Sequence, residues 1–174
     1  MKNLLIVVDY QNDFVDKDGK LYVKNSELLE GNIAREIKLA VTNKDTVIFL
    51  KDTHDKDYMA TEEGRHLPYP HTIKGTFGHE LYGKIYELSK GHTIIEKNSF
   101  GSRDLGLYLD KHHFDNIRLT GIMTNLCVIT NALVAKTFNY NAHIIVIKDC
   151  VGCGDIATDE ILFDVMKTLQ IEIK

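Results

Sequence analysis

The sequence has no tryptophan, only two prolines and only three cysteines among its 174 residues. So few cysteines, and an odd number of them, exclude the disulfide framework that holds small secreted domains together. Cys150 and Cys153 are spaced as C-x-x-C, but a structural zinc site would need a second such pair. We therefore expect two partly buried thiols in a loop, and a redox role for this pair is the alternative.

The sequence also lacks an excess of positive charge and any long apolar run. Its formal net charge is -4 at pH 7, which gives no electrostatic reason to expect nucleic acid or an anionic membrane as a partner. No apolar segment is long enough to span a bilayer, and Asp9 interrupts the first one too early for a signal peptide. We therefore expect a cytoplasmic protein.

No internal repeat, low-complexity tract or flexible linker divides the chain, so residues 1–174 are expected to form a single domain. Short apolar runs alternate with amphipathic segments, which predicts an α/β domain with a mostly parallel sheet. The apolar runs predict strands at residues 4–10, 46–52, 92–98, 116–122, 142–149 and 171–174. The amphipathic segments predict helices at residues 26–43, with Ser26 as N-cap, and at 79–90, 104–113, 125–139 and 158–170.

Titratable side chains follow four of the predicted strands at their carboxyl ends. Asp9 ends the first strand, Asp52 the second and Lys97 the third, and the fourth leads into the turn before Cys127. In parallel sheets, ligands bind just beyond these ends, and core packing gives no reason for titratable groups to gather there. The sequence therefore predicts a functional site at this edge of the sheet.

Cys127, Lys97 and Asp9 supply the three roles that a cysteine nucleophile requires. The start of a helix and a nearby ammonium would lower the pKa of the Cys127 thiol, and the carboxylate of Asp9 would accept its proton. The backbone N–H groups of Met123 and Cys127 would stabilise the oxyanion of a tetrahedral intermediate. Each residue also has an ordinary structural interpretation, since a lone cysteine in an apolar helix is usually part of the core.

A second set of residues has the composition of a metal site. Asp52 and His54, at positions i and i+2 of an extended segment, point to the same side, and the long loop at residues 53–78 brings His71 back toward them. One oxygen and two nitrogen ligands suit zinc, iron or manganese, with open positions for water or substrate. Glu63 is a candidate fourth ligand. Histidines on a surface loop are the alternative interpretation.

Four motifs together resemble the isochorismatase-like cysteine hydrolases, and in particular their nicotinamidase branch. These motifs are VVDYQNDF, KDTHDKDY followed by LPYPHTIKGTFG, EKNSFGS, and TGIMTNLCVITNALVA, in the family's order along nearly the whole chain. The resemblance implies a three-layer α/β/α Rossmann-like domain with a six-stranded, mostly parallel sheet. It implies that Asp9, Lys97 and Cys127 form the catalytic triad, and that a cis peptide bond joins Ile122 to Met123.

The resemblance also implies a divalent metal, with zinc as first candidate, held by Asp52, His54 and His71. Glu63 matches a position where some members have a fourth ligand. The implied reaction is hydrolysis of a small carboxamide through a thioester, with nicotinamide, converted to nicotinate and ammonia in NAD salvage, as the first candidate. Relatives are often oligomers, so a homo-oligomer is expected.

The chain departs from the family's pattern around the substrate pocket. Thr53 stands where many relatives carry a tryptophan, and the segment DCVGCGDIATDE lacks the family's histidine. From their positions, we expect Phe14, Tyr58 and Phe100 to line the pocket. These departures leave open a related amidase that acts on a carbamoyl or ureido substrate. Two further alternatives are hydrolysis by metal-activated water, with Cys127 merely packed in the core, and a non-catalytic binding module.

Overall fold

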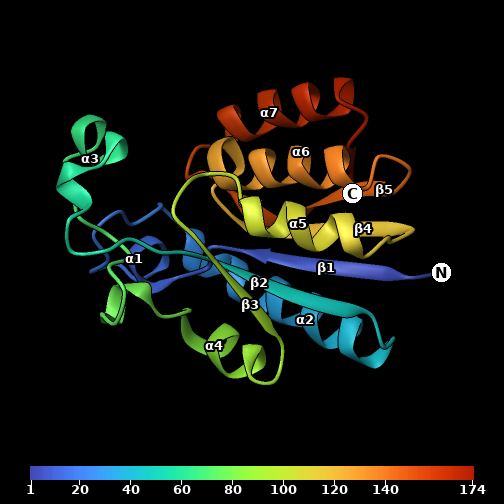
Figure 1. Ribbon diagram of the computed structural model, residues 1–174, viewed down its shortest axis with the longest axis horizontal. Helices are drawn as coiled ribbons and strands as arrows, with labels where there is room; N and C mark the ends of the chain where they lie inside the picture. The colour runs from blue at the N-terminus through green and yellow to red at the C-terminus, as the bar shows by residue number, and fades with distance from the viewer.

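The computed structural model describes residues 1–174 and contains one six-stranded sheet with helices on both faces (Figure 1). All adjacent strands are parallel, and their order across the sheet is β3-β2-β1-β4-β5-β6. The strands are β1 (Asn3–Val8), β2 (Thr46–Asp52), β3 (Thr93–Lys97), β4 (Asn116–Ile122), β5 (His143–Gly152) and β6 (Glu172–Ile173). The predicted α/β/α architecture with a six-stranded sheet is therefore confirmed.

The connections between the strands are mostly helical. The helices are α1 (Asn12–Val15), α2 (Glu30–Thr42), α3 (Glu62–His66), α4 (Gly83–Ser89), α5 (Arg103–Lys111), α6 (Ile129–Phe138) and α7 (Ile156–Thr168). Shorter 3-10 turns form η1 (Ser26–Leu29), η2 (Tyr58–Ala60) and η3 (Phe77–His79), and a π-helical turn, η4 (Thr124–Val128), leads into α6. None of these helices is both long and apolar enough to cross a membrane.

Two apolar cores hold the layers together. β1 lies at the centre, and its alternate side chains point to opposite faces of the sheet. Leu4, Ile6 and Val8 pack into a core shared with α5, α6 and α7, whereas Leu5 and Val7 pack into a core shared with α2 and α4. Figure 1 shows these two groups of helices on opposite sides of the sheet. A continuous apolar run thus becomes a strand that is covered on both faces.

The order of the strands determines where a ligand can bind. The chain first builds β1, β2 and β3 in one direction, and then returns to place β4 on the other side of β1. The loops that follow β1 and β4 therefore diverge and leave a crevice beyond the carboxyl ends of these strands. The segments that carry α1 and α3 extend beyond the same edge of the sheet (Figure 1).

Two local elements differ from the sequence-based prediction. Ser26 does not cap a helix, because the chain forms the 3-10 turn η1 there and the Ser26 hydroxyl donates to the carbonyl of Phe14 at 3.1 Å. The loop at 53–78 contains short helical turns, including α3, whose first turn is capped by the hydroxyl of Thr61. Tertiary contact in the first case and a local cap in the second account for these differences.

The C-x-x-C pair also differs from the prediction that both thiols lie in a loop. β5 continues to Gly152, so Cys150 is a fully buried strand residue, and only Cys153 lies in the following loop. Burial raises the pKa of the Cys150 thiol to about 12. Both cysteines are free thiols, and the interpretation of Cys150 as a small apolar core residue fits its position.

The backbone conformation at position 121 in β4 requires glycine, and replacement of Gly121 is expected to destabilise the protein. It has a φ of +107°, and a Cβ there would lie 2.0 Å from the carbonyl oxygen of Val8. We expect Gly121→Ala to lower the free energy of unfolding by roughly 2–4 kcal/mol, as measured by urea denaturation. Gly31→Ala in α2 is the control, because a Cβ there meets nothing within 4 Å, and it should raise stability by up to about 1 kcal/mol. Equal midpoints for Gly121→Ala and the unchanged protein would contradict this account.

Candidate active site

One ammonium group connects the charged side chains at the carboxyl edge of the sheet. Lys97 is the last residue of β3, and its Nζ lies 2.7 Å from Oδ2 of Asp9 and 3.2 Å from Oδ1 of Asp52. The same Nζ lies 3.6 Å from Sγ of Cys127 and donates to the carbonyl of Ser99 at 3.0 Å. The structure thus brings together the carboxylate, the ammonium and the thiol that the sequence places at the ends of different strands.

Burial controls the ionisation of this cluster. Burial and the charge of Asp9 raise the pKa of the Cys127 thiol well above its usual value, although Lys97 acts in the opposite direction. Burial likewise raises the pKa of Asp9 against the effect of Lys97. Burial opposes the charge of Lys97, but its anionic neighbours outweigh this and raise its pKa. The thiol is therefore protonated at neutral pH, which differs from the lowered pKa expected from the start of a helix.

Asp9 is placed to exchange a proton. Its contact with Lys97 is a close ion pair, yet neither of its buried carboxyl oxygens accepts a hydrogen bond of regular geometry from the protein. Lone pairs on this carboxylate therefore remain available to another donor. A carboxylate with a raised pKa beside a thiol is suited to accept a proton during one step and to return it in the next.

Cys127 lies in the turn that follows β4. The peptide bond between Ile122 and Met123 is cis, as the resemblance implied, and the chain then forms η4 before α6 begins. The carbonyl of Met123 accepts from the N–H groups of Leu126 at 3.2 Å and Val128 at 3.0 Å, whereas its own N–H has no acceptor in the protein. This free N–H is available to an oxyanion.

A second cluster lies beside the first. Asp52, His54 and His71 each offer one ligand atom, and these atoms lie within 4.8 Å of one another. Nε2 of His54 lies 3.1 Å, and Nε2 of His71 3.5 Å, from Oδ2 of Asp52. The carboxylate of Glu63 lies 3.8 Å from Nε2 of His54 and 3.7 Å from Nε2 of His71. All four residues predicted as metal ligands are thus close together.

The donor atoms of this second cluster fit a divalent cation. Nε2 of His54 is buried and forms no hydrogen bond of regular geometry, which is unfavourable unless another group binds it. Nδ1 of His71 lies 2.8 Å from the carbonyl of Tyr69, and this contact directs the lone pair of Nε2 toward the cluster. Although burial opposes it, the neighbouring histidines and Lys97 hold the pKa of Asp52 well below its usual range. Its carboxylate is therefore ionised and available as a ligand.

Three residues for which no role was predicted, Gln11, Asp13 and Thr72, support this cluster. Oε1 of Gln11 accepts the N–H of Asp52 at 2.8 Å, and its Nε2 donates to the carbonyls of Asp52 at 2.8 Å and His79 at 2.9 Å. Oδ2 of Asp13 accepts the N–H of Thr72 at 2.6 Å, and the Thr72 hydroxyl donates to Oδ2 of Asp52 at 2.8 Å. For Gln11 and Asp13 the available signal was the D-x-Q-x-D spacing directly after a buried strand, whereas Thr72 had no such signal.

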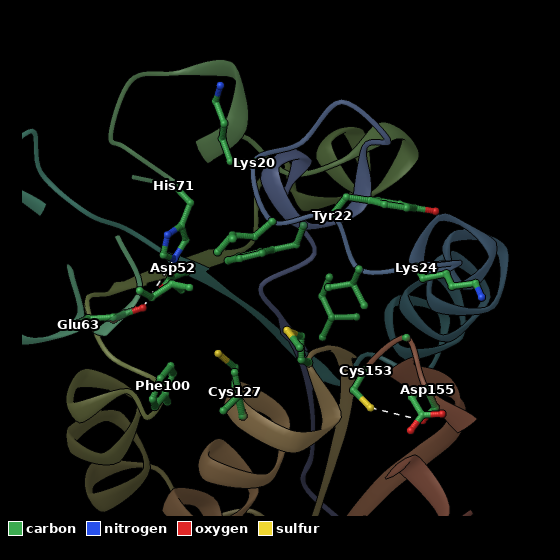
Figure 2. A pocket seen from close by; sticks show the side chains of 18 residues that line it. Lys20, Tyr22, Lys24, Asp52, Glu63, His71, Phe100, Cys127, Cys153 and Asp155 are labelled. Atoms are coloured by element: carbon green, nitrogen blue, oxygen red, sulfur yellow. Dashed lines mark hydrogen bonds and ion pairs between the residues drawn. The ribbon is translucent and has the colours of Figure 1, made fainter. Parts of the chain in front are cut away.

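A cavity of about 580 Å³ opens onto both clusters (Figure 2). Cys127, Asp52, His71 and Glu63 line one part of it, so a bound molecule can contact the thiol and the second cluster at once. Most of the remaining wall is apolar. Such a site, apolar with a few convergent polar groups, is typical of a small-molecule pocket.

The three aromatic residues predicted for the pocket take two different positions. Phe14 and Phe100 line the cavity. Tyr58 does not, because its ring is buried against the imidazoles of His54 and His71, with ring centroids 4.8 Å and 5.1 Å apart. Its hydroxyl donates to the backbone instead. The prediction for Tyr58 was therefore wrong, because its ring packs against His54 and His71 and does not line the cavity.

The chain is similar to known proteins in both sequence and structure. The family model of the isochorismatase domain matches residues 3–173. The uncharacterized isochorismatase family protein PncA of Bacillus subtilis (strain 168) is 37% identical over 162 residues, which cover 87% of each chain. The crystal structure of nicotinamidase/pyrazinamidase PncA from Bacillus subtilis has a TM-score of 0.89 at 29% identity, covering 99% of each chain.

A more distant structure extends this likeness. The crystal structure of pyrazinamidase of Pyrococcus horikoshii in complex with zinc has a TM-score of 0.86 at 23% identity, covering 100% of this chain and 99% of that one. At this identity, the likeness supports the fold alone. The family match covers nearly the whole chain. The chain therefore belongs to the isochorismatase family, whose matched relatives include nicotinamidases, hydrolases of amide C–N bonds.

Proposed function

We propose that this protein hydrolyses the C–N bond of a small carboxamide, with nicotinamide as the first candidate, to give the carboxylate and ammonia. The observation that carries this proposal is that one buried ammonium, Lys97, contacts both the Asp9 carboxylate and the Cys127 thiol beside a cavity. The relative named nicotinamidase/pyrazinamidase supports the choice of substrate. The reaction proceeds through a thioester on Cys127.

The first half of the reaction forms the thioester. Because the thiol of Cys127 is protonated at rest, its proton must leave as Sγ bonds to the carbonyl carbon, and Asp9 accepts it. The N–H groups of Met123 and Cys127 stabilise the resulting oxyanion, each contributing roughly 3 kcal/mol. Asp9 then returns the proton to the nitrogen as the C–N bond breaks, and ammonia leaves.

The second half of the reaction hydrolyses the thioester. A water molecule loses a proton to Asp9 as its oxygen attacks the carbonyl carbon. The C–S bond then breaks and the proton on Asp9 returns to Sγ of Cys127. The product leaves as the carboxylic acid, which ionises to the carboxylate in solution. Lys97 stays an ammonium throughout and offsets the charge of Asp9 whenever that side chain is ionised.

We also propose that Asp52, His54 and His71 hold a divalent cation, with zinc as first candidate, and that Glu63 faces it as a further ligand. When bound, the cation would act as a Lewis acid toward an electron-pair donor of the substrate or toward an ordered water. The chain's own contribution is orientation, because the side chains of Gln11 and of the Asp13–Thr72 pair fix both the backbone and the carboxylate of Asp52.

The proposed function is tested by an ammonia-release screen of the purified protein with nicotinamide, pyrazinamide and a set of carbamoyl and ureido compounds. We expect the aromatic carboxamides to be hydrolysed with the higher kcat/KM, because the cavity is largely apolar. Turnover of the ureido compounds alone would instead favour the related amidase. Release of no ammonia from any compound would overturn the proposal.

His71→Ala is expected to lower metal affinity at least about 100-fold and to remove most of the activity. It deletes one nitrogen of a buried three-residue set. Elemental analysis after dialysis against limiting zinc measures the metal content independently of turnover. His66→Ala is the matched control, because His66 lies in the same segment but is exposed at the end of α3. Stoichiometric metal in the His71→Ala protein would show that the cluster is not the metal site.

A further inference from the structure

The cavity extends well past the groups that the proposed reaction uses. At about 580 Å³ it lies within the range of roughly 300–1,000 Å³ found for pockets that enclose drug-sized ligands, and a single pyridine ring fills only a small part of it. Asp52, Glu63 and Cys127 gather at one end, whereas Cys153 and Asp155 lie at the other (Figure 2). The reaction described above gives this second end no role.

Two loops, residues 20–24 and 153–155, line the far end of the cavity. The first loop is fixed to the body of the protein, since the N–H of Val23 donates to the carbonyl of Phe14 at 2.8 Å. The second loop packs directly on the first. A Cβ added to Gly154 would lie 3.2 Å from the backbone nitrogen of Lys24, so the two backbones approach closely there. The space in front of them is therefore bounded by ordered, mutually packed segments.

The one carboxylate at this end, Asp155, caps α7 by accepting the N–H of Thr158 at 3.2 Å, and the rest of the surface is mainly uncharged. Val23 and Ile122 supply apolar surface, and the side chain of Cys153 lines the cavity as a neutral thiol, since burial raises its pKa. Lys20 and Lys24 contribute their stems, but their ammonium groups point away from the cavity in Figure 2. An apolar group gains free energy here in proportion to the area that it removes from water.

We propose that the preferred substrates are nicotinamide-type carboxamides that carry a second apolar group, such as phenyl or propyl, on the ring edge away from the metal ligands. The carboxamide lies at Cys127, and the added group occupies the space bounded by Val23 and Cys153. This inference rests on the proposed function and extends it from the reaction to the substrate class.

The test compares nicotinamide with 5-propylnicotinamide and 5-phenylnicotinamide, because ring carbon 5 is meta to both the carboxamide and the ring nitrogen. With the metal-loaded protein, we expect kcat/KM for 5-phenylnicotinamide to exceed that for nicotinamide at least about tenfold, the scale of filling an apolar pocket. In Cys153→Phe, whose ring takes up the far end, the ratio of these two kcat/KM values should fall at least about tenfold.

Two further variants keep the test decisive. Ile161→Phe adds the same side chain at an exposed position of α7 outside the cavity, and it should keep the original ratio. Cys153→Leu replaces Cys153→Phe if melting curves show that the larger side chain prevents folding. The ratio must then fall with Leu for the inference to stand.

The outcomes separate this inference from the proposed function. If nicotinamide is hydrolysed but both substituted amides have lower kcat/KM, the extended substrate class is wrong and the proposed reaction stands. If the ratio is unchanged in the Cys153 variants, the far end does not bind the added group, and the inference is also overturned. Hydrolysis of the substituted amides alone supports the inference and shows that nicotinamide is too small. If no amide of the series is hydrolysed, both proposals fall.

Discussion

Replacement of Cys127 by alanine is expected to lower the rate of amide hydrolysis by at least about 10⁴-fold, while metal content and melting temperature stay nearly unchanged. The Cys127 thiol contacts Lys97, and Ala removes both this nucleophile and the thiol proton that Asp9 accepts in the first half of the reaction. The measurements are ammonia release, elemental analysis and thermal melting on the same preparation. Mass spectrometry of the rapidly quenched unchanged protein should show an acyl adduct on Cys127.

Cys150→Ala is the matched control for this experiment. It removes the same atom from a thiol that is buried in the other apolar core and does not line the cavity. Its turnover should remain near that of the unchanged protein, with a modest loss of stability from the small void. A Cys127→Ala protein that keeps its hydrolysis rate would instead favour water activated at the second cluster, with Cys127 as a packing residue.

Lys97→Met is expected to remove activity and also to lower the free energy of unfolding, by roughly 3–5 kcal/mol. Lys97 is the buried counter-ion of both Asp9 and Asp52. Methionine has a similar length but no charge, so the buried carboxylates of Asp9 and Asp52 would lose the ammonium that they share. Urea denaturation of the metal-free protein measures this effect without a contribution from bound cation.

A double variant distinguishes loss of the charge from a general packing defect. Adding Asp9→Asn to Lys97→Met removes one of the two uncompensated carboxylates and should restore part of the lost stability, while activity stays absent. Additive destabilisation by the two changes would contradict the ion-pair account. It would indicate that the length and packing of Lys97, rather than its ammonium, support the site.

The fold was largely predictable because its signals are local. The apolar run that becomes β1 is buried on both faces, and a strand of this kind is recognisable from its consecutive apolar residues. The convergence of Asp9, Lys97 and Cys127 was also predictable, because parallel strands bring their carboxyl ends to one edge. Strand burial and strand direction follow from the residue pattern and the sheet topology, without the positions of individual side-chain atoms.

Properties that depend on side-chain environment were not predictable in this way. The protonated state of the Cys127 thiol follows from its burial next to Asp9, which outweighs the local effect of a helical turn. Tyr58 is close in sequence to His54, but it packs against the imidazoles because the returning loop places His71 on its other side. Likewise, the support of Asp52 by Thr72 exists only after the loop has folded back.

Lys97 belongs to the proposed active site and also helps to hold the edge strand β3 in the sheet. β3 pairs with β2 alone, and most of its side chains are exposed, so its attachment through apolar packing is weak. Its last residue, however, reaches inward to Asp9 on the far side of β2 and is fastened there by buried charge. The groups that would carry out catalysis therefore also hold this outer strand in place. A substitution that tunes the reaction at these residues would also change the attachment of β3.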